Sequence, residues 1–252
     1  MKECLILAAG RGARLDRPNT PKPIVHLGGL PILLRTLDEL HRVGITRAHV
    51  VVGYEQQQIR KVLQTRAWDN MEVVIHQNED WETNMASSVL VAKAAMPPTF
   101  LLLMGDHLFA PALFDQMVAT DAADNVVALI DEEGTEIPEF EEALKLIHNG
   151  NTVSKVGWKI DESTAVEAGF IAANHRLFSA LEAALAENPA AALSDGLARL
   201  AIAGQLRCVP TNGQHWDDID TPAALVRAEG RWRAGRRSAR IKHVAPEVRE
   251  RT

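Results

Sequence analysis

The sequence is poor in cysteine and aromatic residues. Aromatic residues make up only 5% of its 252 residues, although hydrophobic residues reach 46%, which suffices for a sizeable core. The two cysteines, Cys4 and Cys208, lie in apolar, strand-like segments. We therefore expect two buried hydrophobic side chains and neither a disulfide nor a metal-binding pair.

Three further features of the sequence exclude classes of protein. The formal net charge of −6 argues against general nucleic-acid binding. No run of about 18 or more apolar residues occurs, so we expect no transmembrane helix. The first residues, Met1-Lys2-Glu3, lead into a predicted strand and lack the apolar region of a signal peptide. We expect a cytoplasmic enzyme with one large α/β domain or two small ones.

The stretch from Cys4 to Lys22 carries the strongest signal. Residues 4–8 are a short apolar run, which is typical of a buried parallel strand. Gly10 and Gly12 follow, and glycines allow positive φ and bring backbone N–H groups close to a ligand. Arg14 and Lys22 add two positive charges to the same loop. The pattern predicts a binding site for a polyphosphate.

Two other phosphate-binding motifs do not fit this loop. Leu15 replaces the third glycine of the dinucleotide motif G-x-G-x-x-G, and no acidic residue ends a strand about 20 positions later. The P-loop is excluded because no Gly-Lys-Ser/Thr follows the glycines. A simple tight turn would explain the two glycines, but not the added Arg14 and Lys22.

The motif L-A-A-G-x-G-x-R-L followed by P-K resembles the signature of the nucleotidylyltransferases that activate phosphorylated sugars, choline and inositol. In that family the loop wraps the nucleoside triphosphate, and the residues matching Arg14 and Lys22 contact phosphates in the transition state. The resemblance implies nucleotide-binding roles for the loop residues Leu7, Ala8, Ala9, Gly10, Arg11 and Gly12.

Hydrophobic patterning predicts an α/β fold. The first half alternates strands and helices, which implies a parallel sheet with right-handed crossovers. Asn149-Gly150 predicts a type I′ hairpin turn between residues 142–147 and 152–156. The predicted strands are 4–8, 48–52, 72–76, 99–104, 126–130, 166–173 and 206–210, and the helices are 31–43, 56–64, 176–187 and 194–203. We predict a Rossmann-like, mostly parallel sheet with helices on both faces and a small antiparallel insertion, of the nucleotide-diphospho-sugar transferase type that the resemblance implies.

A polar segment, residues 77–88, opens a predicted helix that reaches about residue 95. Thr83 or Asn84 could simply cap that helix. The segment also resembles the base-recognition loop of cytidylyltransferases, in which amides and hydroxyls meet the edge of a pyrimidine. The nucleotide-binding residues implied here are Asn78, Asn84, Ala86, Ser87 and Ser88, with Gly53 and Tyr54 at the end of the neighbouring strand.

Asp106 follows the apolar strand 99–104 in the sequence Gly105-Asp106-His107. Open α/β sheets bind ligands at the carboxyl ends of their strands, and Mg²⁺ is the expected partner of a carboxylate beside a triphosphate. We therefore predict that Asp106 is catalytic and binds Mg²⁺. The alternative is that Asp106 caps a helix that begins near Pro111. His107 is expected to support the site or the acceptor substrate and not to act as a general base.

A second acidic segment, His215 to Pro222, contains Asp217, Asp218 and Asp220. A solvated turn or a helix cap at Thr221 would explain part of it. The pattern W-x-D-I-D-T-P resembles the second metal-binding segment of inositol-phosphate and sugar-phosphate nucleotidylyltransferases. That resemblance implies Asp218 as the second metal ligand, with Asp220 as an alternative or helper.

The region between these segments is expected to bind the acceptor substrate. Residues 131–142 are acidic and irregular, and we expect a solvated loop there. The resemblance places Glu167 and Gly169 at the border of the acceptor. Lys155 is a candidate phosphate-binding cation, although a solvated lysine is the commoner outcome.

The carboxyl-terminal segment is strongly basic. We assign residues 1–230 to the nucleotidylyltransferase domain and 231–252 to a basic tail, which we expect to be a solvated helix end and arm. Contact with an anionic membrane surface is the alternative. The sequence leaves a homodimer open.

Together these features predict an enzyme that transfers a cytidylyl group from CTP to a small phosphorylated alcohol with the help of Mg²⁺. Inositol 1-phosphate is the favoured acceptor, because G-D-H, E-x-G-F and W-x-D-I-D-T-P resemble that branch of the family. Phosphocholine, 2-aminoethylphosphonate, a sugar 1-phosphate or a molybdenum cofactor as acceptor, and UTP or GTP as donor, stay open. An alternative of another class is a non-catalytic, nucleotide-sensing subunit.

Overall fold

The structure is a computed structural model that describes residues 1–15, 19–132 and 140–242. Part of the predicted loop 131–142 and the end of the predicted tail therefore lie outside the described residues. The other predicted strands and helices can be compared with the structure directly.

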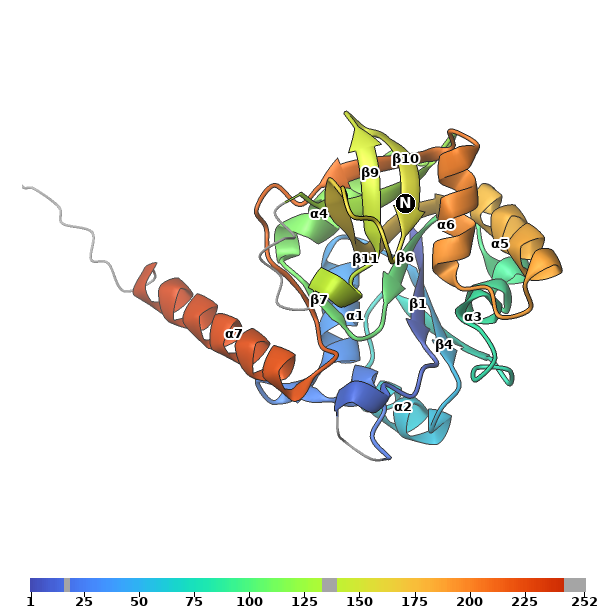
Figure 1. Ribbon diagram of the computed structural model, residues 1–252. Helices are drawn as coiled ribbons and strands as arrows, with labels where there is room; N and C mark the ends of the chain where they lie inside the picture. The colour runs from blue at the N-terminus through green and yellow to red at the C-terminus, as the bar shows by residue number, and fades with distance from the viewer. Residues whose placement is uncertain (16–18, 133–139, 243–252) are drawn as a thin grey trace, which may run out of the picture.

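A nine-stranded sheet runs through the molecule (Figure 1). Its strands, in spatial order, are β5 (Glu72–Gln77), β4 (Arg47–Val52), β1 (Glu3–Ala8), β6 (Thr99–Met104), β11 (Ala165–Asn174), β8 (Val126–Asp131), β12 (Leu206–Pro210), β10 (Thr152–Gly157) and β9 (Lys145–Asn149). The first four are parallel, and β8 is parallel to β12. Strand β11 is antiparallel to β6 and β8, and β9 and β10 form the antiparallel insertion. The predicted α/β sheet with an antiparallel insertion is confirmed, as a mixed sheet in which, across the described part of the chain, four of the eight neighbouring strand pairs are parallel.

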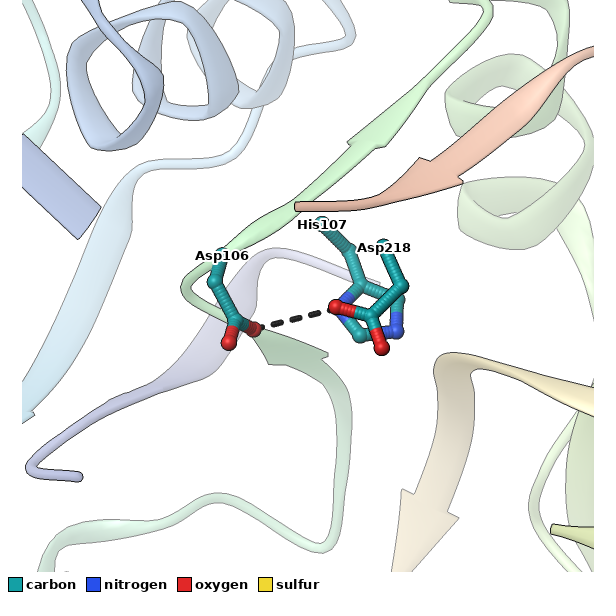
Figure 2. A group of neighbouring side chains, drawn as sticks. All are labelled: Asp106, His107 and Asp218. Atoms are coloured by element: carbon teal, nitrogen blue, oxygen red, sulfur yellow. Dashed lines mark hydrogen bonds and ion pairs between the residues drawn. The ribbon is translucent and has the colours of Figure 1, made fainter. Parts of the chain in front are cut away.

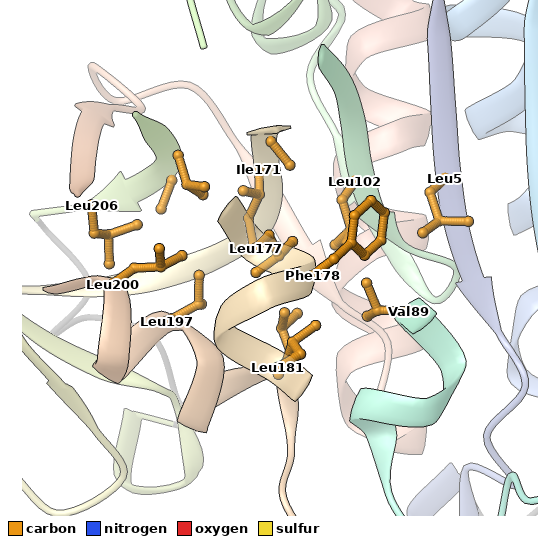
Figure 3. Close-up of a cluster of buried hydrophobic side chains, with 14 of the residues drawn as sticks. Leu5, Val89, Leu102, Ile171, Leu177, Phe178, Leu181, Leu197, Leu200 and Leu206 are labelled. Atoms are coloured by element: carbon orange, nitrogen blue, oxygen red, sulfur yellow. The ribbon is translucent and has the colours of Figure 1, made fainter. Parts of the chain in front are cut away.

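Helices cover both faces of this sheet because its buried strands are apolar on both sides. Along β1, Cys4 and Ile6 belong to one core cluster and Leu5 to the other. The cluster of Cys4 and Ile6 is closed by α1 (Ile32–Arg42), α2 (Gln56–Leu63) and α4 (Pro111–Ala119). The cluster of Leu5 is closed by α3 (Met85–Leu90), α5 (His175–Glu187) and α6 (Leu193–Ile202). Figure 3 shows the latter, with Phe178 of α5 between the strands and the helices.

Helix α1 illustrates how sequence spacing produces this packing. Leu33, Leu37 and Leu40 recur at the spacing of one helix face, and all three are fully buried. The helix begins at Ile32 with Pro31 as its N-cap residue, one position later than predicted. Polar residues occupy the opposite face, so the strip of leucines fixes which side meets the sheet.

Two local predictions are wrong. The hairpin turn lies at Gly150-Asn151, because Asn149 is paired with Thr152 across the hairpin. Within the described residues, Gly150 has positive φ but Asn151 does not, whereas a type I′ turn needs positive φ at both central residues. The alternative role of Asp106 as a helix cap is also wrong, since Ala110 is the N-cap residue of α4.

Short elements complete the chain. Three are strands, β2 (His26–Leu27), β3 (Leu30–Pro31) and β7 (His107–Phe109), and a fourth, β13 (Trp216–Asp218), pairs with β7. Single 3-10 turns are η1 (Ala13–Leu15), η2 (Lys22–Ile24), η3 (Lys93–Ala95) and η5 (Phe140–Glu142). The pair β7–β13 and the turns η1 and η2 build one rim of the cleft described below.

Helix α7 (Pro222–Lys242) leaves the main body and projects from it in Figure 1. Its first turn is capped as predicted, because the Thr221 hydroxyl accepts a hydrogen bond from the Ala224 N–H at 3.1 Å. Leu225 and Ala228 pack beside Leu15 in a third, smaller core cluster. The helix runs across residue 230, where we placed the boundary between domain and tail. In the part of the chain that the structure describes, no helix combines the length and apolarity needed to cross a bilayer.

Candidate functional site

A cleft of about 780 Å³ opens beyond the carboxyl ends of β1 and β6. It brings together the predicted loop, both predicted metal-binding segments and part of the predicted acceptor region. The predicted residues that line it are Leu7, Ala8, Ala9, Gly10, Gly12, Arg14, Lys22, Ser88, Asp106, His107, Glu167, Gly169, Asp218 and Asp220. Residues as far apart along the chain as Leu7 and Asp220 therefore meet in one concavity.

Lys22 reaches this cleft by passing over Gly12. Gly12 has φ +62°, and a Cβ added to it would lie 2.2 Å from Cγ of Lys22. No side chain fits there, so the glycine both forms the turn and leaves room for the lysine. Lys22 itself is only 6% exposed and begins η2 behind Pro21. Its ammonium group is thus held at the floor of the cleft.

Two cations converge on Asp220. One carboxylate oxygen, Oδ1, pairs with the ammonium of Lys22, and the other, Oδ2, accepts a hydrogen bond from the guanidinium of Arg14. Lys22 also lies 3.4 Å from Oδ2 of Asp106. The second terminal nitrogen of Arg14 pairs with Glu142 of η5. The two cations predicted to bind phosphate therefore lie side by side.

Asp106 and Asp218 meet through the pairing of two short strands. Asp106 occupies the turn between β6 and β7, and the β7–β13 register places Asp218 opposite His107. The backbone N–H of Ile219 donates to the carbonyl of Asp106 at 3.2 Å, which fixes this arrangement. Figure 2 shows the three side chains pointing toward one another, and their potential ligand atoms all lie within 4.8 Å.

This group suits a divalent cation that prefers oxygen ligands. Mg²⁺ is commonly held by one or two carboxylates together with phosphate oxygens and water. Asp106 and Asp218 supply two such carboxylates at the edge of the cleft. The carboxylates of Asp106 and Asp218 therefore fit a divalent cation such as the predicted Mg²⁺.

His107 lies beside the carboxylates of both Asp106 and Asp218. Its Nδ1 lies 3.1 Å from Oδ1 of Asp106 and 3.8 Å from Oδ1 of Asp218. Its ring stacks on Trp216, with 5.8 Å between the ring centroids. Burial alone would lower the pKa of His107, but the neighbouring charges of Asp218 and Asp106 outweigh burial and raise the pKa to about 9. The imidazolium partly neutralises the two acids.

Glu167 and Gly169 of β11 lie next to His107. Gly169 has φ +80°, and a Cβ added to it would lie 2.7 Å from Cδ2 of His107. The Gly169 N–H donates to Oε1 of Glu167 at 2.8 Å. Burial raises the pKa of Glu167 to about 7, although this hydrogen bond and the charge of His107 lower it. In this structure Gly169 makes room for His107.

Comparison with known proteins identifies the family. Residues 4–204 match the family described as MobA-like NTP transferase domain. The chain belongs to this family. It is thus a member of a nucleotidyltransferase family, as the loop motif predicted.

Relatives of this MobA-like domain are distant and longer. The bifunctional IPC transferase and DIPP synthase of Aquifex aeolicus is 26% identical over 233 residues, which cover 91% of this chain and 51% of the relative. The CMP-5'-(3-aminopropyl)phosphonate synthase of Streptomyces rubellomurinus is 35% identical over 127 residues, or 49% of this chain and 20% of that protein. The chain spans about half the length of the bifunctional relatives it matches.

A solved structure confirms the fold class. The inositol-1-phosphate CTP transferase from T. maritima superposes with a TM-score of 0.79 at 21% sequence identity, covering 89% of this chain and 91% of that one. At this identity the likeness establishes the fold. The predicted nucleotide-diphospho-sugar transferase type of sheet is confirmed.

Within the MobA-like domain, the residues predicted to read the base are mostly engaged in internal hydrogen bonds. Asn84 caps α3, since its side chain accepts from the Ser87 N–H at 2.6 Å, so the cap interpretation is confirmed. The buried Asn78 amide donates to the hydroxyls of Ser87 at 3.0 Å and Ser88 at 2.9 Å. Ala86 is fully buried. Of this set, only Ser88 lines the cleft.

Gly53, Tyr54 and Arg11 form a neighbouring group outside the cleft lining. The Tyr54 N–H donates to the carbonyl of Ala9 at 2.9 Å, which ties the end of β4 to the loop. The guanidinium of Arg11 lies 5.8 Å from the centre of the Tyr54 ring. Trp81 covers Gly53, where an added Cβ would meet Trp81 side-chain atoms at 2.6 Å. This group braces the loop, and Trp81 covers the surface of Gly53, one of the residues that the resemblance implied for nucleotide binding.

The structure does not bring Lys155 into the cleft, because this lysine is exposed on β10. It adds residues that sequence reasoning missed, among them Glu142, Trp216 and Asp131. The Trp216 indole N–H donates to Oδ2 of Asp131 at 2.8 Å. Asp131 ends β8 at the same sheet edge where Asp106 follows β6, and this position was a signal in the sequence that could have identified it.

Proposed function

We propose that this MobA-like domain transfers a cytidylyl group from CTP to a small phosphorylated alcohol, with inositol 1-phosphate as the favoured acceptor and pyrophosphate as the second product. The observation that carries this proposal is the convergence of Arg14 and Lys22 with Asp106 and Asp218 in one cleft. The inositol-1-phosphate CTP transferase from T. maritima, whose fold this chain shares, supports the choice of donor and acceptor.

The chemistry asks the protein mainly to position anions and to stabilise charge. A phosphate oxygen of the acceptor is already anionic at neutral pH, so it attacks the α-phosphorus of CTP without a general base. Arg14 and Lys22 neutralise charge on the transferring group and on the leaving pyrophosphate. The backbone from Gly10 to Gly12 supplies N–H groups to the β- and γ-phosphates. Asp106 and Asp218 would hold Mg²⁺, which would supply positive charge to the reacting phosphates.

The cleft offers the acceptor a place beside the carboxylates. His107, Glu167 and Gly169 line it next to Asp106, and the exposed ring of Trp158 stands over its outer part. Glu167 is a hydrogen-bond partner for hydroxyl groups of an alcohol. We therefore assign the acceptor to this side of the cleft and the nucleotide to the side of β1 and Ser88.

The test is pyrophosphate release by the full chain, measured with each of the four nucleoside triphosphates and each candidate acceptor. Cytidylyl transfer predicts the highest kcat/KM with CTP. Lys22→Ala and Asp106→Ala are expected to lower it by about a hundred- to a thousandfold, because each removes a charge that stabilises the transition state. Lys93→Ala, which removes an ion pair with Glu182, is the matched control. Near-wild-type turnover by either cleft variant would falsify the assignment.

The Streptomyces relative favours a second acceptor class, because it is a synthase of a CMP-linked phosphonate. Aminoalkylphosphonates and phosphocholine therefore belong among the acceptors tested. A non-catalytic nucleotide-sensing role predicts nucleotide binding with no pyrophosphate release for any acceptor. The cytoplasmic location, a homodimer and the solvated or membrane-facing role of the basic tail stay predictions.

A further inference from the structure

The two aspartates of the D-I-D segment have different surroundings, and we propose that they have different functions. Asp220 is a positioning residue that holds Arg14 and Lys22 in place for the triphosphate, and Asp218 alone is the metal ligand of this segment. This inference rests on the proposed function for the identity of the ligand. It replaces the expectation, implied by the resemblance, that Asp220 is an alternative metal ligand.

Asp220 is held in ion pairs with both cations of the cleft. Its side chain is 8% exposed, and each of its two oxygens pairs with a different cation. The side chain of Lys22 is also 8% exposed. Its charge is compensated mainly by Asp220, since Asp106 is farther away at 3.4 Å. A buried ion pair with both carboxylate oxygens engaged fixes the geometry of its cations.

The position of Asp220 relative to the metal group carries the second step. The potential ligand atoms of Asp106, His107 and Asp218 lie within 4.8 Å of one another, and Asp220 is not part of that group. Both oxygens of Asp220 already pair with Lys22 or Arg14, so a divalent cation there would have to displace one of these partners as well as lie beside two like charges. Asp220 therefore serves the two cations and not the metal.

Glu142 provides a contrast on the same guanidinium. It pairs with Arg14 as Asp220 does, but its side chain is 59% exposed and comes from η5, across the cleft. An exposed ion pair contributes little to stability and is easily exchanged for a stronger partner. A triphosphate entering the cleft therefore displaces Glu142 from Arg14, whereas Asp220 stays in place. The two carboxylates are expected to affect phosphate binding in opposite directions.

The experiment compares four variants of the full chain: Asp220→Asn, Glu142→Gln, Asp218→Asn and the control Asp115→Asn. Asp115 is an exposed aspartate that pairs with Arg42 away from the cleft. Binding of inorganic tripolyphosphate in EDTA reports on the cations without metal, base or acceptor. Titration of activity with Mg²⁺ reports on the metal site, and kcat and KM for CTP are measured for each variant.

We expect Asp220→Asn to weaken metal-free tripolyphosphate binding by about tenfold and to lower kcat by about a hundredfold, because charge-assisted bonds that orient the cations are lost. Its half-saturating Mg²⁺ concentration stays that of the wild type. Glu142→Gln binds tripolyphosphate as tightly as the wild type or several-fold more tightly. Asp218→Asn retains tripolyphosphate binding and needs more Mg²⁺.

The inference is overturned if Asp220→Asn raises the Mg²⁺ requirement as Asp218→Asn does while it binds tripolyphosphate normally. It is equally overturned if Glu142→Gln weakens tripolyphosphate binding, a readout that remains available if Asp220→Asn fails to fold. If the wild type binds tripolyphosphate but transfers no nucleotide, the proposed function fails while the roles of the two carboxylates remain measurable.

Discussion

The aliphatic part of the Lys22 side chain fills the space beside Gly12 that a Cβ of residue 12 would need. The distance from such a Cβ to Cγ of Lys22 would be 2.2 Å, and to Cδ and Cε 2.6 Å. The second glycine of the loop is therefore required by a side chain ten positions away. The placement of a predicted catalytic cation depends on the absence of one carbon atom.

Gly12→Ala is accordingly expected to displace Lys22 and to lower kcat/KM by about a hundredfold, with the fold retained. Part of any stability loss comes from positive φ itself, at about 1 kcal/mol. Gly29→Ala is the matched control, since Gly29 has φ +85° but nothing lies within 4 Å of its added Cβ. Pyrophosphate release and thermal unfolding of both variants check the prediction. Equal activity losses in the two variants would contradict it.

Metal removal is expected to abolish transfer and leave the fold intact. Asp106 immediately precedes β7 and Asp218 ends β13, and these two short strands pair through their backbones, so circular dichroism should not change in EDTA. Activity should return on addition of Mg²⁺. Full activity in EDTA would exclude a role for a metal.

Asp106→Asn is expected to lower activity about a hundredfold or more, whereas the exposed Asp124→Asn should not change it.

The stability of the metal-free protein should depend on Glu167 between about pH 4.5 and 7. Burial raises the pKa of this group from an ordinary value of 4.5 to about 7, so the folded state holds the proton more tightly than the unfolded chain does. Stabilisation by this group is therefore complete below pH 4.5 and is lost as pH rises through 7. The loss is about 3 kcal/mol.

Glu167→Gln isolates this effect, because an amide oxygen can still accept the Gly169 N–H and cannot ionise. Chemical denaturation of both proteins in EDTA across this pH range gives the difference. His107 titrates at higher pH, to about 9, and is common to both proteins. A constant difference between the two unfolding free energies would contradict the assignment.

Asn78→Ala is expected to lower stability by about 1–3 kcal/mol and to leave the choice of nucleotide unchanged. Its amide bonds to Ser87 and Ser88 join the end of β5 to α3, and the side chain is buried. Asn151→Ala in the exposed hairpin turn is the control. If Asn78→Ala instead shifts the ratio of CTP to UTP use without loss of stability, the base-recognition role implied by the resemblance is correct.

Neither cysteine should react with a thiol reagent in the folded protein. Cys4 and Cys208 are free and buried, as the sequence predicted, and burial raises the pKa of Cys208 to about 11. At pH 8 both are therefore protonated as well as covered. Titration with a chromogenic disulfide should detect two thiols only after denaturation. Rapid reaction of one equivalent in the native state would show that one of these segments opens.

Much of the fold follows from local pattern. The strand Thr99–Met104 was predicted without error, and α1, α5 and α6 were displaced by one residue at most at either end. These segments carry long apolar runs or a clear helical period, which fix their type before any tertiary contact forms. The hairpin turn was misplaced because Gly150 tolerates several turn types, and strand register decided among them.

The sequence by itself determined the β-α-β order, the glycine-rich loop with Arg14 and Lys22, and the carboxylate that follows β6, because these depend on residue type and short spacing. Only the tertiary structure decided the contacts of the two aspartates in the D-I-D segment. Asp218 and Asp220 are chemically identical and two positions apart, yet strand β13 turns the first toward Asp106 and the second pairs with Lys22 and Arg14. The surroundings of each charge are set by residues that are distant in the chain, and these cannot be read from the spacing of neighbouring residues.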